Sequence, residues 1–97
     1  MNYQKQLNNY LENETSDVKK ACYTLATLDL EGFLNEGYTK GQLIKRKYKE
    51  MKNRYNLDTE TAKPLLYKAF DLLLDFNKER QKIEELEREL RHDIYDI

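Results

Sequence analysis

The sequence predicts an all-α protein, a small bundle of four helices whose last helix continues into an extended and charged C-terminal segment. Three glycines and one proline among 97 residues are too few for the many tight turns of a β-sandwich or barrel. Fifteen leucines, against five isoleucines and valines together, favour helix over strand. A chain of this length forms one domain, and because 36% of its residues are charged, its apolar core is predicted to be small.

The first predicted helix covers residues 3–13. Tyr3, Leu7, Tyr10 and Leu11 recur there at helical spacing. Three asparagines in the same stretch are poor helix formers. This helix is therefore predicted to fray or to pack as an arm on the rest of the chain.

The second predicted helix covers residues 17–36. Thr15 offers an N-cap, and Asp17 an acidic residue in the first turn. A stripe then follows at steps of three and four, namely Val18, Cys22, Leu25, Leu28 or Asp29, and Phe33. Because Cys22 belongs to this apolar stripe, we expect it to be a small buried thiol rather than a reactive one.

The third predicted helix covers residues 40–55. Gly37 suits the left-handed position that ends the preceding helix, and Thr39 with Gln42 forms the capping box that starts the new one. Its apolar residues include Leu43, Ile44, Met51 and Tyr55. The pattern then breaks over residues 53–57.

Pro64 constrains the start of the fourth helix, because a proline is tolerated in the first turn and disrupts the interior. Thr61 as N-cap would place Pro64 at the third helical position, with residues 58–60 forming the turn before it or a short frayed first turn. The residues that follow make a broad apolar face, namely Ala62, Leu65, Leu66, Ala69, Phe70, Leu73 and Phe76. We expect this to be the core helix of the domain.

The last segment, residues 77–97, contains no glycine or proline, so the fourth helix is predicted to run on through it as a charged helix beyond a helical core of residues 1–76. Ile83, Leu86, Leu90 and Ile97 follow one another at spacings of three, four and seven. Polar residues interrupt this seam, so it predicts a short segment that forms a homodimer or higher oligomer, or that folds back on the core.

Membrane and secretory features are missing from the pattern. The N-terminal residues lack the apolar stretch of a signal peptide, and the longest aliphatic run is residues 72–74. Cys22 is the only cysteine, which excludes an intrachain disulfide and favours a reducing, cytoplasmic location. No membrane partner is predicted.

Catalytic and metal-binding patterns are also missing. His92 is the only histidine and lies far from Cys22 in the sequence, so no nucleophile and base are evident. Glu84 and Glu85 lie in a run of alternating charge, which is typical of a solvated helix face. We predict a non-enzymatic protein with no cofactor and no metal.

The charges are unevenly distributed although the whole chain carries a net charge of only −1. Residues 1–38 carry 3 basic and 6 acidic side chains, residues 39–68 carry 9 and 3, and residues 69–97 carry 5 and 9. A basic middle between acidic ends favours one surface that contacts an anionic partner. Pairing within the molecule between the middle and the ends is the alternative.

The basic middle resembles a known DNA-binding arrangement. The stretch Gly37-Tyr38-Thr39-Lys40-Gly41-Gln42-Leu43-Ile44, followed by Tyr55-Asn56-Leu57-Asp58-Thr59-Glu60-Thr61-Ala62-Lys63, resembles the helix-turn-helix of bacteriophage small terminase (DNA-packaging) subunits. In that family an aromatic-Asn-aliphatic turn precedes the recognition helix, and an oligomerising helical segment follows. The resemblance covers residues 37–70 and implies a helix-turn-helix at residues 39–76.

The resemblance also implies which residues contact nucleic acid. Thr59, Thr61 and Lys63 would approach base edges, and Tyr67 and Lys68 would lie near the groove wall. The implied contacts to phosphate are Lys40, Lys45, Arg46, Lys49 and Lys52. Because Asp58 and Glu60 would repel phosphates, and no arginine starts this helix, the pattern favours the helix-turn-helix shape over sequence-specific reading.

Two functions follow as hypotheses. The first is a small nucleic-acid-binding protein of phage or mobile-element type, with DNA as the expected partner. The second is a protein-binding inhibitor or adaptor that acts on a host nucleic-acid enzyme. Eight tyrosines are compatible with the second hypothesis, since tyrosine is enriched at protein interfaces, although their spacing also fits the edge of a helical core.

Overall fold

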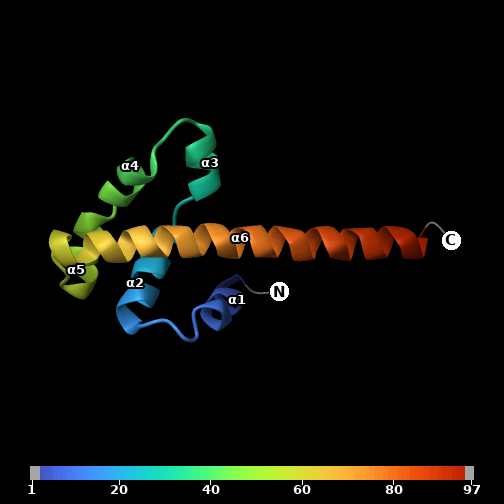
Figure 1. Cartoon of the computed structure of the whole chain (residues 1–97), viewed down its shortest axis with the longest axis horizontal. Coiled ribbons are helices and arrows are strands. Elements are labelled where there is room, and N and C mark those ends of the chain that lie inside the picture. Colours follow the sequence, from blue (N-terminus) through green and yellow to red (C-terminus); the bar gives the residue numbers. More distant parts are fainter. Residues whose placement is uncertain (1–2, 96–97) are drawn as a thin grey trace.

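The computed structural model describes the backbone of residues 3–95 and the side chains of residues 3–90. Within residues 3–95 it contains helices and no strand, which confirms the predicted all-α class. The helices are α1 (Tyr3–Tyr10), α2 (Ser16–Leu25), α3 (Leu30–Asn35), α4 (Lys40–Lys45), α5 (Tyr48–Tyr55) and α6 (Thr59–Tyr95). The five short helices gather around the first half of α6, and the second half of α6 extends past all of them (Figure 1).

One stripe along α6 provides the surface on which the other helices pack. Its buried residues follow one another at steps of three and four, namely Ala62, Leu66, Ala69, Phe70, Leu73 and Phe76. The predicted core face of this helix is thereby confirmed, except that Leu65 is only half-buried. α2 crosses this stripe, and α4 and α5 pack on it near the start of α6.

All six helices contribute to a single buried cluster. Besides the α6 stripe it contains Leu7, Leu11, Val18, Ala21, Cys22, Leu25, Leu30, Leu43, Ile44 and Met51. The expected burial of Cys22 is confirmed, because its side chain is fully covered. Short helices of six to ten residues are marginal alone, so this shared cluster is what makes them stable.

α1 is shorter than the predicted helix over residues 3–13, because it ends at Tyr10. The N–H groups of Glu12 and Glu14 donate to carbonyls three residues earlier, which tightens the chain into a turn. α1 nevertheless packs on the core, since the rings of Tyr3 and Tyr10 lie 5.4 and 5.3 Å from the ring of Phe76.

The single helix predicted over residues 17–36 is wrong, because the chain forms α2 and α3 with a break at residues 26–29. Thr15 caps α2 as predicted, accepting a hydrogen bond from the N–H of Val18. Asp29 is a second N-cap, whose carboxylate accepts from the N–H of Gly32 at 3.1 Å. A Cβ atom at position 32 would lie too close to a carboxylate oxygen of Asp29, so a larger residue there would require this side chain to shift.

The predicted turn between α3 and α4 is confirmed. Gly37 is left-handed, with φ of 100°, and the N–H of Tyr38 donates to the carbonyl of Phe33 as in a Schellman motif. The rings of these two residues pack edge to face at 5.2 Å. Thr39 and Gln42 form the reciprocal capping box that starts α4.

The helix predicted over residues 40–55 is also two helices, because the chain turns at residues 46–47 between α4 and α5. No glycine or proline marks this break. The N–H of Lys47 donates to the carbonyl of Ile44 at 2.9 Å, which closes α4 with a tight turn. The ammonium of Lys47 also reaches Thr27, just beyond α2, so contacts outside the segment favour the break. Two broken helices explain why six helices replace the predicted four.

The predicted N-cap of the last helix at Thr61 is wrong, because α6 starts at Thr59 and Asp58 caps it. The carboxylate of Asp58 accepts from the N–H of Thr61 at 2.8 Å. These hydrogen bonds from the backbone and hydroxyl of Thr61 hold the pKa of Asp58 below its usual 3.8. Pro64 thus lies inside the helix and cannot donate to the carbonyl of Glu60, and both residues are exposed to water.

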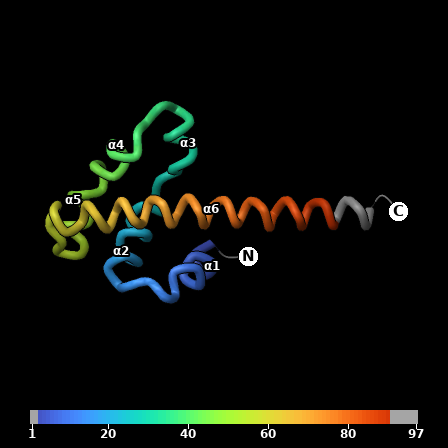
Figure 2. The backbone as a smooth tube through the Cα atoms, in the orientation of Figure 1, coloured from blue at the N-terminus to red at the C-terminus, as the bar shows by residue number. Residues whose placement is uncertain are grey.

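The free half of α6 gives the molecule its elongated shape, 58 × 31 × 16 Å. The radius of gyration is 16.1 Å, whereas a compact domain of this length has about 13 Å. Figure 2 shows that no other segment accompanies α6 beyond the level of α1. Although α6 is long, no helix within residues 3–95 combines the length and the apolar character needed to cross a membrane.

The start of α6 is tested by comparing Asp58→Ala with Thr61→Ala. We expect Asp58→Ala to lower the melting temperature by a few degrees at neutral pH, because it removes the N-cap. The stability from Asp58 depends on its charge, so the difference from the natural protein should shrink as the pH falls below 3.8. Thermal unfolding followed by circular dichroism measures both effects.

Asp58→Asn is the matched control, since asparagine also caps helices but does not titrate, and it should retain most of the stability. A larger loss for Thr61→Ala than for Asp58→Ala would contradict this start of α6.

Candidate nucleic-acid interface

The chain between α5 and α6 forms the short turn that a helix-turn-helix requires. Asn56 ends α5 in the left-handed conformation, with φ of 57°, and its N–H donates to the carbonyl of Lys52. Asn is one of the few residues that adopt this backbone without large strain. Residues 56–58 therefore reverse the chain, and α6 begins immediately after Asp58.

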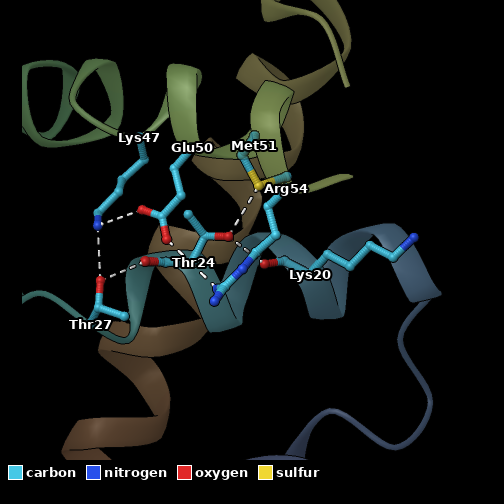
Figure 3. A network of polar contacts seen from close by, with 7 residues as sticks. All are labelled: Lys20, Thr24, Thr27, Lys47, Glu50, Met51 and Arg54. Atoms are coloured by element: carbon cyan, nitrogen blue, oxygen red, sulfur yellow. Dashed lines mark hydrogen bonds and ion pairs between the residues drawn. The ribbon is translucent and has the colours of Figure 1, made fainter. Parts of the chain in front are cut away.

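A network of polar contacts holds α5 against the end of α2 (Figure 3). The ammonium of Lys47 donates to Glu50 at 2.8 Å and to the hydroxyl of Thr27 at 2.9 Å. Arg54 approaches the other oxygen of Glu50 at 3.7 Å. Glu50 thus neutralises part of the positive charge of Lys47 and Arg54, two of the basic residues in the segment 39–68.

The same network continues into the core through Thr24, a fully buried polar residue. Its hydroxyl lies 2.9 Å from the carbonyl oxygen of Lys20 and 3.2 Å from the sulfur of Met51. The carbonyl of Thr24 in turn accepts from Thr27. These contacts fix the position of α5 relative to α2 and hence of the side chains on its outer face.

Three lysines on α4 and α5 remain exposed and have no ion-pair partner among the described side chains, namely Lys45, Lys49 and Lys52. Lys49 and Lys52 are three residues apart on α5, a spacing that places them on neighbouring parts of one helix face. Lys52 acts on the exposed carboxylate of Asp58 and helps to lower the pKa of that group, but none of the three lysines forms an ion pair within the described side chains, so they are available to an anionic partner. We name Lys45, Arg46, Lys49, Lys52 and Arg54 the basic surface.

A shallow hollow of about 590 Å³ lies within the basic surface. It is lined by Arg46, Lys49, Glu50, Asn53 and Arg54. The guanidinium of Arg46 stacks 4.8 Å from the centre of the Tyr38 ring, which orients the charge while leaving the residue exposed. Arginine, lysine and asparagine side chains around an open hollow can donate hydrogen bonds to phosphate oxygens.

Two cations that the resemblance assigned to nucleic acid are bound within the protein instead. The ammonium of Lys40 lies 2.6 Å from Asp71 and over the rings of Tyr67 and Phe70, at 5.3 and 5.4 Å. Lys68 lies 3.4 Å from Glu14 in the loop after α1. Both side chains therefore help to hold the bundle together.

The residues expected near base edges lie at the start of α6 and do not form one surface with each other. Thr59, Thr61 and Lys63 are exposed. Thr61 and Lys68 are seven residues apart and share one side of the helix, whereas Lys63 and Tyr67 are four apart and share another. Tyr67 is half-buried against the core.

Asp58 adds a negative charge at the tip of the helix-turn-helix. The carboxylate is fully exposed, and its lowered pKa keeps it ionised at neutral pH. Phosphates are therefore repelled at the point where a recognition helix would enter a groove. The geometry favours contact through α4 and α5 over contact through the start of α6.

Sequence reasoning missed the pairing of Glu50 with Lys47 and Arg54. The spacing contained the signal, because Glu50 follows Lys47 by three residues and precedes Arg54 by four, which are the separations of helical ion pairs. Pairs between distant segments, such as Lys40 with Asp71, have no comparable signal.

The described tyrosines do not form a binding surface. All seven in the part of the chain whose side chains are described are half-buried and packed against the core, namely Tyr3, Tyr10, Tyr23, Tyr38, Tyr48, Tyr55 and Tyr67. They form the amphipathic edge of the bundle, where the rings cover apolar residues, and the hydroxyl of Tyr23 donates to Asn8 at 2.6 Å.

The predicted oligomerisation residues are exposed on the free half of α6. Ile83, Leu86 and Leu90 are 51%, 58% and 63% exposed. Ile97, the last member of the predicted seam, and His92 lie outside the residues whose side chains are described.

Neither nucleophilic nor metal chemistry has a basis in the described side chains. Burial raises the pKa of Cys22 to about 12, so its thiol stays protonated at neutral pH. Within the described part of the chain no group of three or more histidines, cysteines and acidic residues is placed to hold a metal ion.

Comparison of the chain with protein families, curated proteins and solved structures finds no match. The geometry and charge of this molecule are therefore the basis for a proposed function.

The state of Cys22 is tested with a thiol-reactive aromatic disulfide. We expect almost no labelling of the native protein at pH 8, because the thiol is buried and its pKa is about 12. Complete labelling should follow unfolding in denaturant, which serves as the positive control. Rapid stoichiometric labelling of the folded protein would show that Cys22 is accessible and ionised.

Proposed function

We propose that this protein binds nucleic acid, with DNA as the first expected ligand, through phosphate contacts made by the basic surface on α4 and α5. One observation carries the proposal: Lys45, Lys49 and Lys52 are exposed without an ion-pair partner among the described side chains. The acidic residue on the same helix, Glu50, is already engaged by Lys47 and Arg54.

The physical basis of this binding is the release of counterions. A duplex carries one phosphate charge per about 1.7 Å, and each lysine that neutralises a phosphate releases part of the condensed cations. Three free lysines supported by Arg46 would give modest affinity that falls steeply with salt. Because the core anchors α5 through Thr24 and Met51, these charges are presented on a fixed backbone.

Contact through phosphates predicts little preference among sequences. The groups that would read bases start α6, beside the ionised carboxylate of Asp58 and the acidic Glu60. The backbone and hydroxyl of Thr61 are bound by Asp58, so this residue is occupied before any base arrives. The helix-turn-helix is then a rigid mount for the basic surface rather than a reader of sequence.

A protein-binding adaptor or inhibitor is the second candidate function. The observation that favours it is the exposure of three large aliphatic side chains on the free half of α6. Failure of the protein to bind nucleic acid at low salt would make this candidate the leading one.

Fluorescence anisotropy of a labelled random-sequence duplex tests the proposal at about 50 and 200 mM salt. We expect affinity to collapse between the two salt concentrations. The double variant Lys45→Glu with Lys49→Glu should weaken binding at least about tenfold and reduce the slope of log affinity against log salt by about 2. Thr61→Ala should leave the preference among sequences unchanged.

Lys5→Glu with Lys78→Glu is the matched control, because both lysines are exposed, lie away from α4 and α5, and give the same change in net charge. Equal losses for the two double variants would mean that net charge alone matters. Undiminished binding by Lys45→Glu with Lys49→Glu would show that the basic surface is not the site.

A further inference from the structure

The free half of α6 exposes an apolar line that the bundle does not cover. Ile83, Leu86 and Leu90 follow one another at steps of three and four, so they lie along one side of the helix. Each of these side chains is more than half exposed. Charged residues surround them, and we name residues 77–90 the overhang.

The apolar line leads into a groove of about 470 Å³ between α1 and α6. Tyr10 of α1 forms one wall, and Phe76, Glu79 and Ile83 of α6 form the floor. Arg80 closes one side, because its guanidinium stacks 4.7 Å from the Tyr3 ring and donates to Gln6 at 2.9 Å. Tyr10, Phe76 and Ile83 offer apolar contact to a large side chain from another helix, and polar residues line the rest of the groove, namely Gln6, Asn9, Glu79, Arg80, Glu84 and Glu87.

We propose that the overhang pairs with the overhang of a second copy of this chain, with the two helices antiparallel. This inference does not depend on nucleic-acid binding. The charges on either side of the apolar line select the second copy, since they are complementary to those of the same helix running in the opposite direction.

The antiparallel register follows from the apolar residues. Placing Ile83 opposite Leu86 of the second copy creates two equivalent apolar layers related by the twofold axis. The same register brings Leu90 of the second copy to the level of Glu79, between Phe76 and Ile83. Leu90 then enters the groove beside Tyr10, so one register explains both the exposed leucine and the groove.

The flanking charges agree with this register. Lys82 lies on one side of the apolar line and faces Glu89 of the second copy. Both side chains are exposed and have no ion-pair partner among the described residues. On the other side Glu87 of the second copy approaches Arg80, and the symmetry doubles each pair.

A parallel arrangement conflicts with the position of α1. Tyr3 and Tyr10 pack on Phe76, on the side of α6 that continues into the apolar line. In a parallel pair the two bundles would lie at the same end. The second α6 would then have to occupy the space that α1 fills beside Phe76, and α1 through α5 of the second copy would also have to fit there. In the antiparallel arrangement only the last turns of the second helix reach the level of Phe76, and the two bundles lie at opposite ends.

Light scattering after size exclusion and sedimentation equilibrium test the proposal on the full chain. We expect a dimer for the natural protein and a monomer for Leu86→Lys. Lys82→Glu and Glu89→Lys alone should each weaken dimerisation about tenfold, because each replaces two attractive pairs with two repulsive ones. Combining them should restore the natural affinity, because the pairs are then attractive in the reversed sense.

The double variant also separates the two helix directions. In a parallel pair Lys82 would lie beside Glu87 of the second copy, so the double variant would keep a repulsive contact and would not recover. Lys78→Glu and Glu85→Lys are the matched controls, since both residues are exposed on the overhang away from the apolar line. Circular dichroism verifies that every variant is folded.

A monomeric natural protein would overturn the proposal and would leave the apolar line to a different protein. An assembly larger than a dimer, a double variant that stays weak, or controls as damaging as Lys82→Glu would also overturn it. Duplex binding by Leu86→Lys reports separately on the proposed function, because this substitution leaves the basic surface intact.

Discussion

The packing of short helices against the stripe from Ala62 to Phe76 on α6 is the interaction on which the rest of the structure depends. None of the other helices exceeds ten residues, and helices of that length are marginal in water without tertiary contacts. The stripe buries Leu66, Phe70 and Leu73 almost completely, and α2 crosses it with Val18, Ala21, Cys22 and Leu25 inward. The position of every surface side chain, including the basic surface, is set through this one helix.

The same helix also separates two kinds of surface. Its first half supports α4 and α5, whose exposed cations remain on the outside. Its second half no longer has the full stripe, because Arg80 and Glu87 stand seven and fourteen residues after Leu73, where the bundle would need apolar residues. α6 therefore continues as a helix beyond the bundle, and the bundle does not cover this part of it. Pairs such as Arg80 with Glu84, 3.7 Å apart, support that extension locally, though exposed pairs of this kind contribute little each.

Local signals in the sequence predicted the parts of the fold that depend on neighbouring residues. Gly37, the Thr39 capping box and the α6 stripe were all evident, because turn chemistry and helical spacing act within a few residues. The two helix breaks were not, since residues 46–47 carry no breaker and Lys47 gains its partner Thr27 only in the folded molecule. Asp29 and Asp58 are N-caps, and the sequence contained a local signal for each. The prediction nevertheless placed Asp29 inside a helix and Asp58 in a turn.

The candidate site was predictable to a similar degree. The basic middle of the chain was visible from composition, but which cations remain free depends on distant partners. Asp71 lies thirty-one residues after Lys40 and Glu14 lies far before Lys68, and these pairs remove two of the expected phosphate contacts. In the antiparallel dimer the remaining basic surfaces would lie about 70 Å apart along the shared axis, given the rise of 1.5 Å per helical residue. That separation is close to two turns of B-DNA at about 34 Å per turn. If both proposals hold and the two basic surfaces face the same side of the dimer, one duplex would contact both copies, which would compensate for the small number of free lysines on each copy.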